Sequence, residues 1–228
     1  MDKKYIIDIY QEYQKKYVSK FGEKTVVLLQ VGGFFEIYAI DTPQEKWNVK
    51  LLKDVCSLLQ FIWNVKQKDS KRPHLIAGLP LVSLQKHLQK LLQNAYTVIL
   101  VEQETNGEPN PDRRVTNIYS PGTNVIYHDD YQSNWLCVIC VEPYNFYQSC
   151  EIGLVAGIAF TDLSTGVTYL SETGSEKNDL DFCYDEMYRL LQIYKPSEVL
   201  LYNRDPVKIK NETILKKLEL DIDSIYCK

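Results

Sequence analysis

The residues best suited to chemistry lie in one short stretch, V-G-G-F-F-E-I-Y at residues 31–38. Two adjacent glycines, Gly32 and Gly33, permit a tight turn or a close approach of the backbone to a ligand. Phe34 beside such a turn could serve as an apolar wedge, and Glu36 could accept a hydrogen bond from a ligand. The alternative is a hairpin whose two phenylalanines are both buried, because buried aromatic residues are common.

A second candidate is the basic segment Q-K-D-S-K-R-P at residues 67–73, which follows a strand-like stretch. Its cations, together with the lysine before it, could contact phosphate groups; they are Lys66, Lys68, Lys71 and Arg72. A solvated turn would have the same composition. The sequence leaves both interpretations open.

The cysteines and the glycine-rich loops predict no metal site and no nucleotide site. Cys137 and Cys140 form a C-x-x-C pattern inside an apolar run, without a second pair at zinc-like spacing, so we expect buried free thiols. The sequence contains no G-x-x-x-x-G-K-[ST], G-x-G-x-x-G, G-x-S-x-G or H-E-x-x-H motif. We therefore expect neither a cofactor nor an enzymatic activity in this chain, and we nominate no catalytic residue.

One enzymatic alternative rests on Asp162, at the end of the strand-like run G-I-A-F-T-D. Nucleases of the ribonuclease H type place a metal-binding aspartate at such a position, and two-metal hydrolysis needs several converging carboxylates. No partner carboxylate is singled out by the sequence. The simpler interpretation is a turn in which Asp162 accepts a hydrogen bond from the amide of Ser164 or Thr165.

Length and composition indicate a globular protein. The 228 residues can form one large domain or two ordinary ones, and they are 45% hydrophobic and 25% charged. No apolar run reaches the roughly 18–20 residues that span a bilayer, and the N-terminus M-D-K-K-Y lacks the features of a secretory signal. We expect an intracellular, non-membrane protein; the cytoplasm, the nucleus, the mitochondrion and a viral origin are not distinguished.

The charge is divided unevenly along the chain. Residues 1–120 carry 17 Lys and Arg against 13 Asp and Glu, whereas residues 121–228 carry 9 against 17, so the net charges are +4 and −8. Such asymmetry suggests two units with different partners. The first unit is basic enough to permit phosphate contacts without requiring them.

Hydrophobic periodicity predicts two successive α/β units. In the first, a mixed sheet carries helices, in the order helix 3–21, strands 25–31 and 34–40, helix 44–59 (burying Trp47), strands 61–66 and 74–80, helix 82–94, and strands 96–102 and 113–119. In the second, strands 135–141, 152–161 and 167–171 precede helix 179–194, strand 198–202, helix 206–219 and strand 222–226. The expected boundaries are a first domain at 1–124, a polar linker at 125–133 and a second domain at 134–228.

Six motifs resemble, in the same order, those of MutS-family DNA mismatch repair proteins. G-G-F-F-E-I-Y resembles the signature G-D-F-Y-E-L-F of the family's first domain. The later matches are A-G-L-P at 77–80 with A-G-I-P, V-I-L-V-E-Q at 98–103 with V-A-I-C-E-Q, R-R-V-T-N-I-Y-S-P-G-T at 113–123 with R-x-V-x-x-x-x-T-P-G-T, T-D-L-S-T-G at 161–166 with D-x-S-x-G, and K-P-S-E-V-L-L-Y at 195–202 with P-x-E-L-L-Y. Together they cover nearly the whole chain.

The resemblance implies a mixed-sheet mismatch-recognition domain followed by a ribonuclease H-like connector domain, which is incomplete here. It assigns Phe34 to the wedge that enters the minor groove and stacks on a mispaired base, and Glu36 to the carboxylate that hydrogen-bonds this base. Gly32 and Gly33 would let the backbone approach the groove. Phe35, next along the strand, should point to the opposite face and pack inward.

For the full-length protein, the resemblance implies a dimer that binds double-stranded DNA with mispairs or small loops. ATP and Mg²⁺ would be used by an ATPase domain outside this chain, and a repair protein could dock on the connector. The chain departs from the signature at Gly33, where the family has an acid, and at Phe35, where it has a tyrosine; Leu81 and Val82 replace a Tyr-His pair. These departures resemble divergent homologues of large DNA viruses and of some mitochondria.

Overall fold

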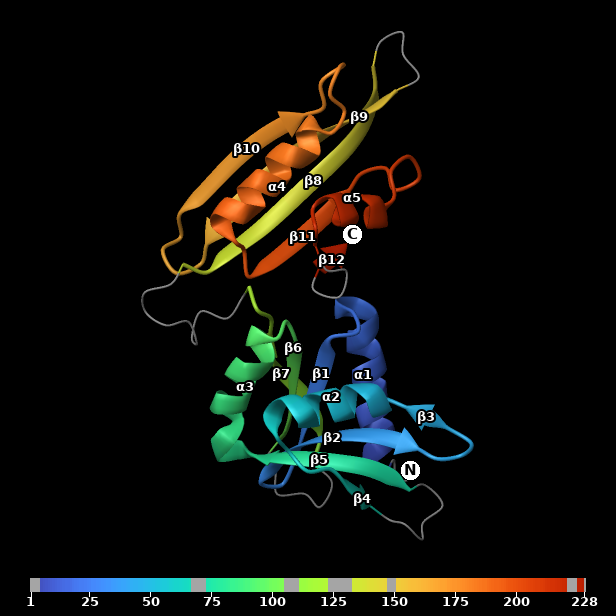
Figure 1. Cartoon of the computed structure of the whole chain (residues 1–228). Coiled ribbons are helices and arrows are strands. Elements are labelled where there is room, and N and C mark those ends of the chain that lie inside the picture. Colours follow the sequence, from blue (N-terminus) through green and yellow to red (C-terminus); the bar gives the residue numbers. More distant parts are fainter. Residues whose placement is uncertain are drawn as a thin grey trace. The chain divides into compact units, whose positions relative to one another are not determined.

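The computed structural model describes residues 5–66, 73–104, 111–122, 133–146, 151–220 and 225–227. They form two compact units, Met1–Ser120 and Pro121–Lys228, each built around its own β-sheet (Figure 1). Both units combine helices with a sheet of mixed strand directions, so the α/β class predicted from the sequence is confirmed. No helix among the described residues is long and apolar enough to cross a membrane.

In the first unit the strand order is β4-β5-β2-β1-β6-β7, with β3 paired to β2. The β1–β6 pair is parallel and the other pairs are antiparallel. The elements are α1 (Ile6–Phe21), β1 (Thr25–Val31), β2 (Phe34–Asp41), β3 (Lys46–Trp47), α2 (Val49–Leu59), β4 (Asn64–Lys66), β5 (His74–Pro80), the 3₁₀ turn η1 (Leu81–Ser83), α3 (Leu84–Gln93), β6 (Thr97–Gln103) and β7 (Arg113–Tyr119).

Helix α1 is fixed to the central strand β1 by a buried glutamine. Gln14 donates from Nε2 to the carbonyl of Thr25 at 2.6 Å, and its Oε1 accepts the Val27 amide at 2.9 Å. One turn earlier, the Tyr10 ring lies 5.2 Å from the Tyr38 ring of β2, both fully buried. This helix therefore covers the Tyr38 face of the sheet, and α2 and α3, which pack on β2, β5 and β6, cover the opposite face.

The second predicted helix begins later than the apolar spacing suggests. Thr42 and Glu45 close a turn, since the Thr42 amide donates to the Glu45 carbonyl at 2.9 Å and the Glu45 amide donates to Thr42 Oγ1 at 3.0 Å. The chain then pairs as β3 with β2, and helix α2 begins only at Val49. Trp47 was expected in a helix, but it lies in this short strand, where its ring meets Tyr10 at 5.9 Å. Pairing with β2 thus makes Lys46 and Trp47 a strand, although the apolar spacing of residues 44–59 predicts a helix.

In the second unit the strand order is β10-β9-β8-β11-β12. Strands β8 to β10 are antiparallel neighbours, and β11 runs parallel to both β8 and β12. The elements are β8 (Trp135–Asn145), β9 (Ile152–Asp162), β10 (Thr168–Gly174), α4 (Phe182–Tyr194), β11 (Glu198–Asn203), α5 (Asn211–Lys217) and β12 (Ile225–Cys227).

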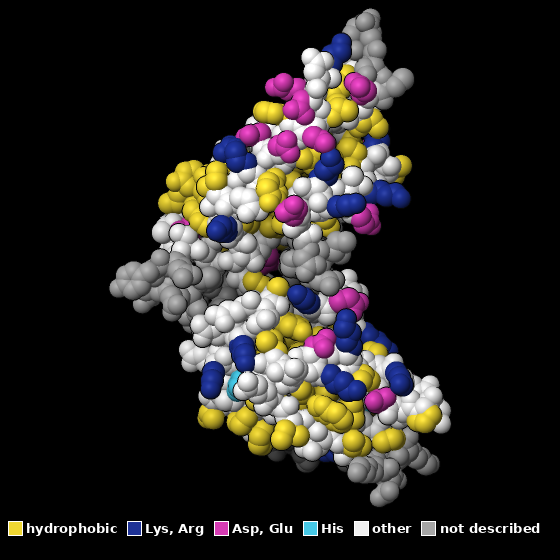
Figure 2. All heavy atoms as spheres, viewed as in Figure 1, with side chains coloured by type: hydrophobic (Ala, Val, Ile, Leu, Met, Phe, Trp, Pro, Cys, Tyr) yellow, Lys and Arg dark blue, Asp and Glu magenta, His cyan; other side chains and the backbone are white. Residues whose placement is uncertain are grey.

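Helix α4 provides much of this unit's core against alternate residues of β8 and β9. Ile139 and Val141 are buried on this face, together with Met187 and Leu191 of the helix. Val138, on the other face of β8, is exposed, so alternation along the strand separates a packed face from an open one. Acidic side chains gather over the part of the unit that holds α4, in agreement with the net charge of residues 121–228 (Figure 2).

Gly122, just after β7, belongs to the second unit and is hydrogen-bonded within it. The Gly122 amide donates to Glu198 Oε2 at 2.7 Å, and Asn134 Nδ2 donates to the Gly122 carbonyl at 3.4 Å. Most of the expected linker, residues 125–132, lies outside the described residues. The domain boundary at 124 and the connector assignment of the second unit stay predictions.

Candidate functional site

The turn between β1 and β2 is a two-residue hairpin turn made by Gly32 and Gly33. Val31 and Phe34 face each other across the hairpin as its last pair. Gly32 has φ +59°, a left-handed value that favours glycine and that tight hairpin turns require at their first position. Gly33 has an ordinary φ, and a side chain there would meet no atom within 4 Å. The turn conformation therefore requires glycine at its first position, Gly32, more than at its second, Gly33.

The first residues of β2 alternate between solvent and core. Phe34 is 49% exposed, Phe35 is 1% exposed, Glu36 is half-buried and Ile37 is buried. Because side chains alternate along a strand, Phe34 and Glu36 lie on one face while Phe35 and Ile37 pack into the core on the other. Of the two phenylalanines, only Phe35 belongs to the core.

A network of amide groups holds the turn in place. The Gly32 amide donates to Gln103 Oε1 at 3.0 Å, and the Gln103 amide donates to Gln30 Oε1 at 2.9 Å. Gln30 Nε2 closes the ring by donating to the Gly32 carbonyl at 3.3 Å. Arg113 Nε donates to the Gln30 carbonyl at 3.3 Å from the start of β7. Both polar groups of Gly32 are thus bonded to side chains, which restricts the motion of the turn.

Strand β5 supports the other side of the turn. Pro80 pairs with Phe34, and the Leu81 amide donates to the Gly33 carbonyl at 3.1 Å. Val82, in the 3₁₀ turn that follows, is 96% exposed. This end of the sheet therefore presents two exposed apolar side chains, Phe34 and Val82, on a backbone that is held from both neighbouring strands.

Glu36 has a hydrogen-bond donor beneath it. The Tyr38 hydroxyl, two residues further along the same face of β2, donates to Glu36 Oε2. Burial raises the pKa of Tyr38 well above its ordinary value of 10.0, and the hydrogen bond to Glu36 raises it further. The phenol therefore keeps its proton. An exposed aromatic tip and a supported carboxylate on one face could insert between flat groups and accept a hydrogen bond from one of them.

Lys66, the described cation of the basic segment, does not lie next to this turn. Lys66 is exposed at the end of β4 and pairs with His74, whereas Phe34 pairs with Pro80. His74 and Pro80 are six positions apart along β5, which corresponds to roughly 20 Å. Lys68, Lys71 and Arg72 lie outside the described residues.

Asp162 caps a turn in the second unit. Its Oδ1 accepts the amides of Asn134 and Ser164, both at 3.0 Å, and its Oδ2 accepts the Thr165 hydroxyl at 2.8 Å. Burial alone would raise the pKa of Asp162, but the hydrogen bonds from Ser164, Thr165 and Asn134 lower it. Among the described residues, no group of three or more His, Cys, Asp or Glu could hold a metal ion. The geometry supports the turn-capping interpretation.

The thiols of the C-x-x-C pattern lie on different faces of β8. Cys137 is fully buried and Cys140 is half-buried, and both are free, as are Cys56 and Cys183. Burial raises the pKa of the Cys137 thiol to about 12, so it stays protonated. Cys137 matches the expectation of a buried free thiol, whereas Cys140 is free but only half-buried.

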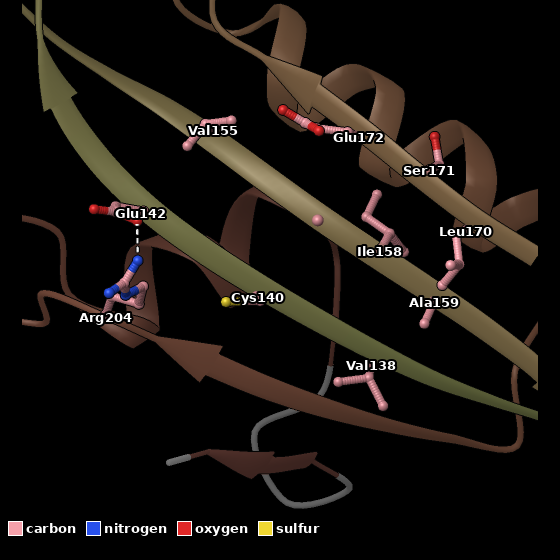
Figure 3. A pocket seen from close by; sticks show the side chains of 11 residues that line it. Val138, Cys140, Glu142, Val155, Ile158, Ala159, Leu170, Ser171, Glu172 and Arg204 are labelled. Carbon is pink, nitrogen blue, oxygen red and sulfur yellow. Dashed lines mark hydrogen bonds and ion pairs between the residues drawn. The ribbon is translucent and has the colours of Figure 1, made fainter.

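A shallow hollow of about 590 Å³ lies on the open face of the second sheet (Figure 3). Its lining is small and apolar where β8, β9 and β10 run side by side, as at Val138, Gly157 and Leu170. At one end Glu142 of β8 forms an ion pair with Arg204, which follows β11. The hollow therefore has a polar end but no converging set of catalytic groups.

Comparison with known proteins agrees with the motifs around the glycine turn. The family model for MutS domain I matches residues 9–127, which is more than half of the chain. The chain belongs to the MutS family. The match includes the whole of the wedge turn, by which we mean Gly32, Gly33 and Phe34, as well as Gln103 and Arg113.

Individual relatives carry the same family name. A putative DNA mismatch repair protein, a MutS homologue of Acanthamoeba polyphaga mimivirus, is 31% identical over 98% of this MutS chain and 20% of its own length. The DNA mismatch repair proteins MutS of Petrotoga mobilis and Salinibacter ruber are 26% and 25% identical, over 86% and 82% of the chain and 21% and 18% of their lengths. The chain thus spans about a fifth of these relatives, and it is more similar to the viral protein than to the two bacterial ones.

The geometry of this MutS-family chain includes residues to which the sequence motifs assign no role. Tyr38 stands where the G-D-F-Y-E-L-F signature has a phenylalanine, and its distance of two residues from Glu36 could have indicated a contact on one strand face. Gln30 and Gln103 are 73 residues apart, and no local pattern connects them. Only the pairing of β6 with β1 brings them together.

Proposed function

We propose that the first unit binds mismatched double-stranded DNA in DNA mismatch repair, with Phe34 as a minor-groove wedge and Glu36 as the group that hydrogen-bonds the mispaired base. The observation that carries this proposal is the placement of a half-exposed Phe34 and a supported Glu36 on one face of β2, at the end of the sheet. Family membership supports it, because the matched region is MutS domain I and the relatives are named DNA mismatch repair proteins.

The physical basis for mismatch selectivity is the cost of unstacking. An apolar side chain that enters a base step kinks the duplex by roughly 20–90° in known wedge proteins. Unstacking a sound base pair costs a few kcal/mol, and a mispaired base costs less because it is already poorly stacked. Selectivity then depends on deformability rather than on base sequence. Phe35 and Ile37, which pack in the core on the opposite face of β2, would keep the strand in place when Phe34 inserts between bases.

The decisive experiment measures binding of the full-length protein to a duplex with one G·T mispair and to the matched homoduplex. We expect wild type to prefer the mispaired duplex and Phe34→Ala to remove this preference. Tyr169→Ala is the matched control, because Tyr169 is an aromatic residue of the second unit with the same exposure, 50%. If Phe34→Ala kept the wild-type preference, the wedge assignment would be wrong.

We further propose that the basic segment, Lys66, Lys68, Lys71 and Arg72, contacts DNA phosphates at a distance from the wedge. Roughly 20 Å along β5 corresponds to about six base steps of 3.4 Å. Each phosphate contact contributes about 0.9 to the slope of log affinity against log salt concentration. Replacing the four cations by glutamine should lower this slope without changing the preference for the mispair. An unchanged slope would contradict the contact.

For the whole protein we propose, by its resemblance to the MutS family, a dimer that recognises mispairs or small loops and uses ATP and Mg²⁺ through a domain outside this chain. The acidic second unit, a ribonuclease H-like connector in this proposal, would dock a repair protein rather than DNA, because its net charge of −8 repels phosphate. Capture of such a partner should require residues 134–228 and no DNA. We assign no catalytic step to the residues of this chain.

A further inference from the structure

Tyr38 is built into the sheet as a fixed donor for Glu36. Its side chain is fully buried, with its ring 5.2 Å from that of Tyr10 and 5.6 Å from that of His74. Asn48 Nδ2 donates to the Tyr38 backbone carbonyl at 2.8 Å, which fixes the strand at this residue. The phenol oxygen therefore has a defined position, and from there it donates to Glu36.

Glu36 itself has fewer restraints. Its backbone is paired on both sides, with Leu29 of β1 and Gly78 of β5, but its side chain is only half-buried and carries several rotatable bonds. A glutamate that must be ordered on binding loses side-chain entropy. A donor that orders the carboxylate before binding removes part of this cost. The Glu36 stem lies beside Gly78, where an added Cβ would meet Glu36 Cγ at 3.5 Å, an ordinary contact.

We propose that Tyr38 is a positioning residue for mismatch recognition, which holds one oxygen of Glu36 so that the other faces the base beside Phe34. This inference rests on the proposed function of Phe34 and Glu36. Tyr38 does not touch DNA: it is fully buried and acts through the carboxylate. Tyr38 therefore contributes to the preference for the mispaired duplex and not to the overall affinity for DNA.

The test is a double-mutant cycle in the full-length protein, with Tyr38→Phe, Glu36→Ala and the combination of both. The ratio of affinities for a G·T duplex and its homoduplex is measured for each. Tyr38→Phe keeps the ring and removes one hydroxyl, and we expect it to lower the ratio by about three- to tenfold, as for one hydrogen bond. In the Glu36→Ala background, where the hydroxyl has no carboxylate to hold, Tyr38→Phe should have no effect on the ratio.

Tyr96→Phe is the matched control, because it removes the hydroxyl of another buried tyrosine of the first unit, which lies just before β6 and not on β2. A merely structural effect would appear in both tyrosine variants, whereas a positioning effect appears only in Tyr38→Phe. An equal effect of Tyr38→Phe with and without Glu36, or no effect at all, overturns the inference. If Phe34→Ala and Glu36→Ala both kept the wild-type ratio, the proposed function itself would fail, and this result is distinct from a failure of Tyr38 alone.

Discussion

Two hairpin turns of this molecule are stabilised by different residues. The β9–β10 turn and the wedge turn between β1 and β2 each contain a glycine with a left-handed φ, +76° at Gly166 and +59° at Gly32. In β9–β10, Asp162 at the end of β9 caps the turn, since its carboxylate accepts two amides and a hydroxyl. In β1–β2, distant glutamines hold the turn, and the acid lies two residues beyond the exposed Phe34.

The difference shows how a carboxylate is kept available for a ligand. The β9–β10 turn is stabilised mainly by its own acid, with Asn134 as a further partner, and this leaves Asp162 saturated with hydrogen bonds. A turn that is stabilised by Gln30 and Gln103 leaves Glu36 for other contacts. A carboxylate close to a glycine turn is therefore a candidate ligand-binding group only when other residues satisfy the turn.

The largest expected effect separates the two phenylalanines that follow the wedge turn. Phe35→Ala should lower the free energy of unfolding by about 3–5 kcal/mol, because it removes a fully packed side chain. Phe34→Ala should cost far less stability, since half of its side chain is already in solvent. Urea unfolding of both variants measures the contrast. Equal losses would mean that Phe34 is part of the core and is not free to insert.

The next effect concerns the two turn glycines. Gly32→Ala should destabilise the chain by about 1–2 kcal/mol, because alanine is strained at this φ. Gly33→Ala should change stability by less than about 0.5 kcal/mol, since its φ is ordinary and the space is open. Gly166→Ala is the matched variant in the other hairpin and should behave like Gly32→Ala. Similar midpoints of urea unfolding for the Gly32 and Gly33 variants would contradict the turn geometry.

Gln103→Ala should cost about 1 kcal/mol, because the Gly32 amide loses its acceptor. The looser turn should also reduce the preference for a G·T duplex while the homoduplex affinity stays unchanged. Gln93→Ala, at the exposed end of α3, is the control for loss of a glutamine side chain. A Gln103 variant with the wild-type preference would show that the wedge needs no support from β6.

The smallest effect is a dependence of stability on pH through Asp162. Asp162 has a pKa below its ordinary value of 3.8 in the folded chain, so its contribution to stability is present above pH 3.8 and is lost as the pH falls through the folded value. The stability difference between wild type and Asp162→Asn should therefore shrink in acid. Glu36→Gln should leave stability within about 0.5 kcal/mol of wild type at pH 7. A pH-independent difference for Asp162→Asn would contradict its role as a cap.

The sequence predicts the parts of this arrangement that depend on local rules. Alternation along a strand predicts that Phe34 and Phe35 point to opposite faces, and the glycine pair marks the turn. It does not predict the Gln103 bond to Gly32, because that contact depends on the parallel β1–β6 pairing across the unit. Trp47 is placed wrongly for a similar reason: the helical spacing is real, but pairing with β2 decides the local structure.

The hydrogen bond from Gly32 to Gln103 also has a consequence for the order of events during synthesis of the chain. These residues are 71 positions apart, so the turn emerges from a ribosome well before its support does. At about 5–20 residues per second, synthesis of the intervening chain takes roughly 4–14 s. During this interval the nascent chain contains every residue of the wedge turn but lacks the strand that orients it. Under the proposed function, DNA recognition by this turn would therefore require β6, and a chain arrested before β6 would contain the motif without the Gln103 bond that holds it.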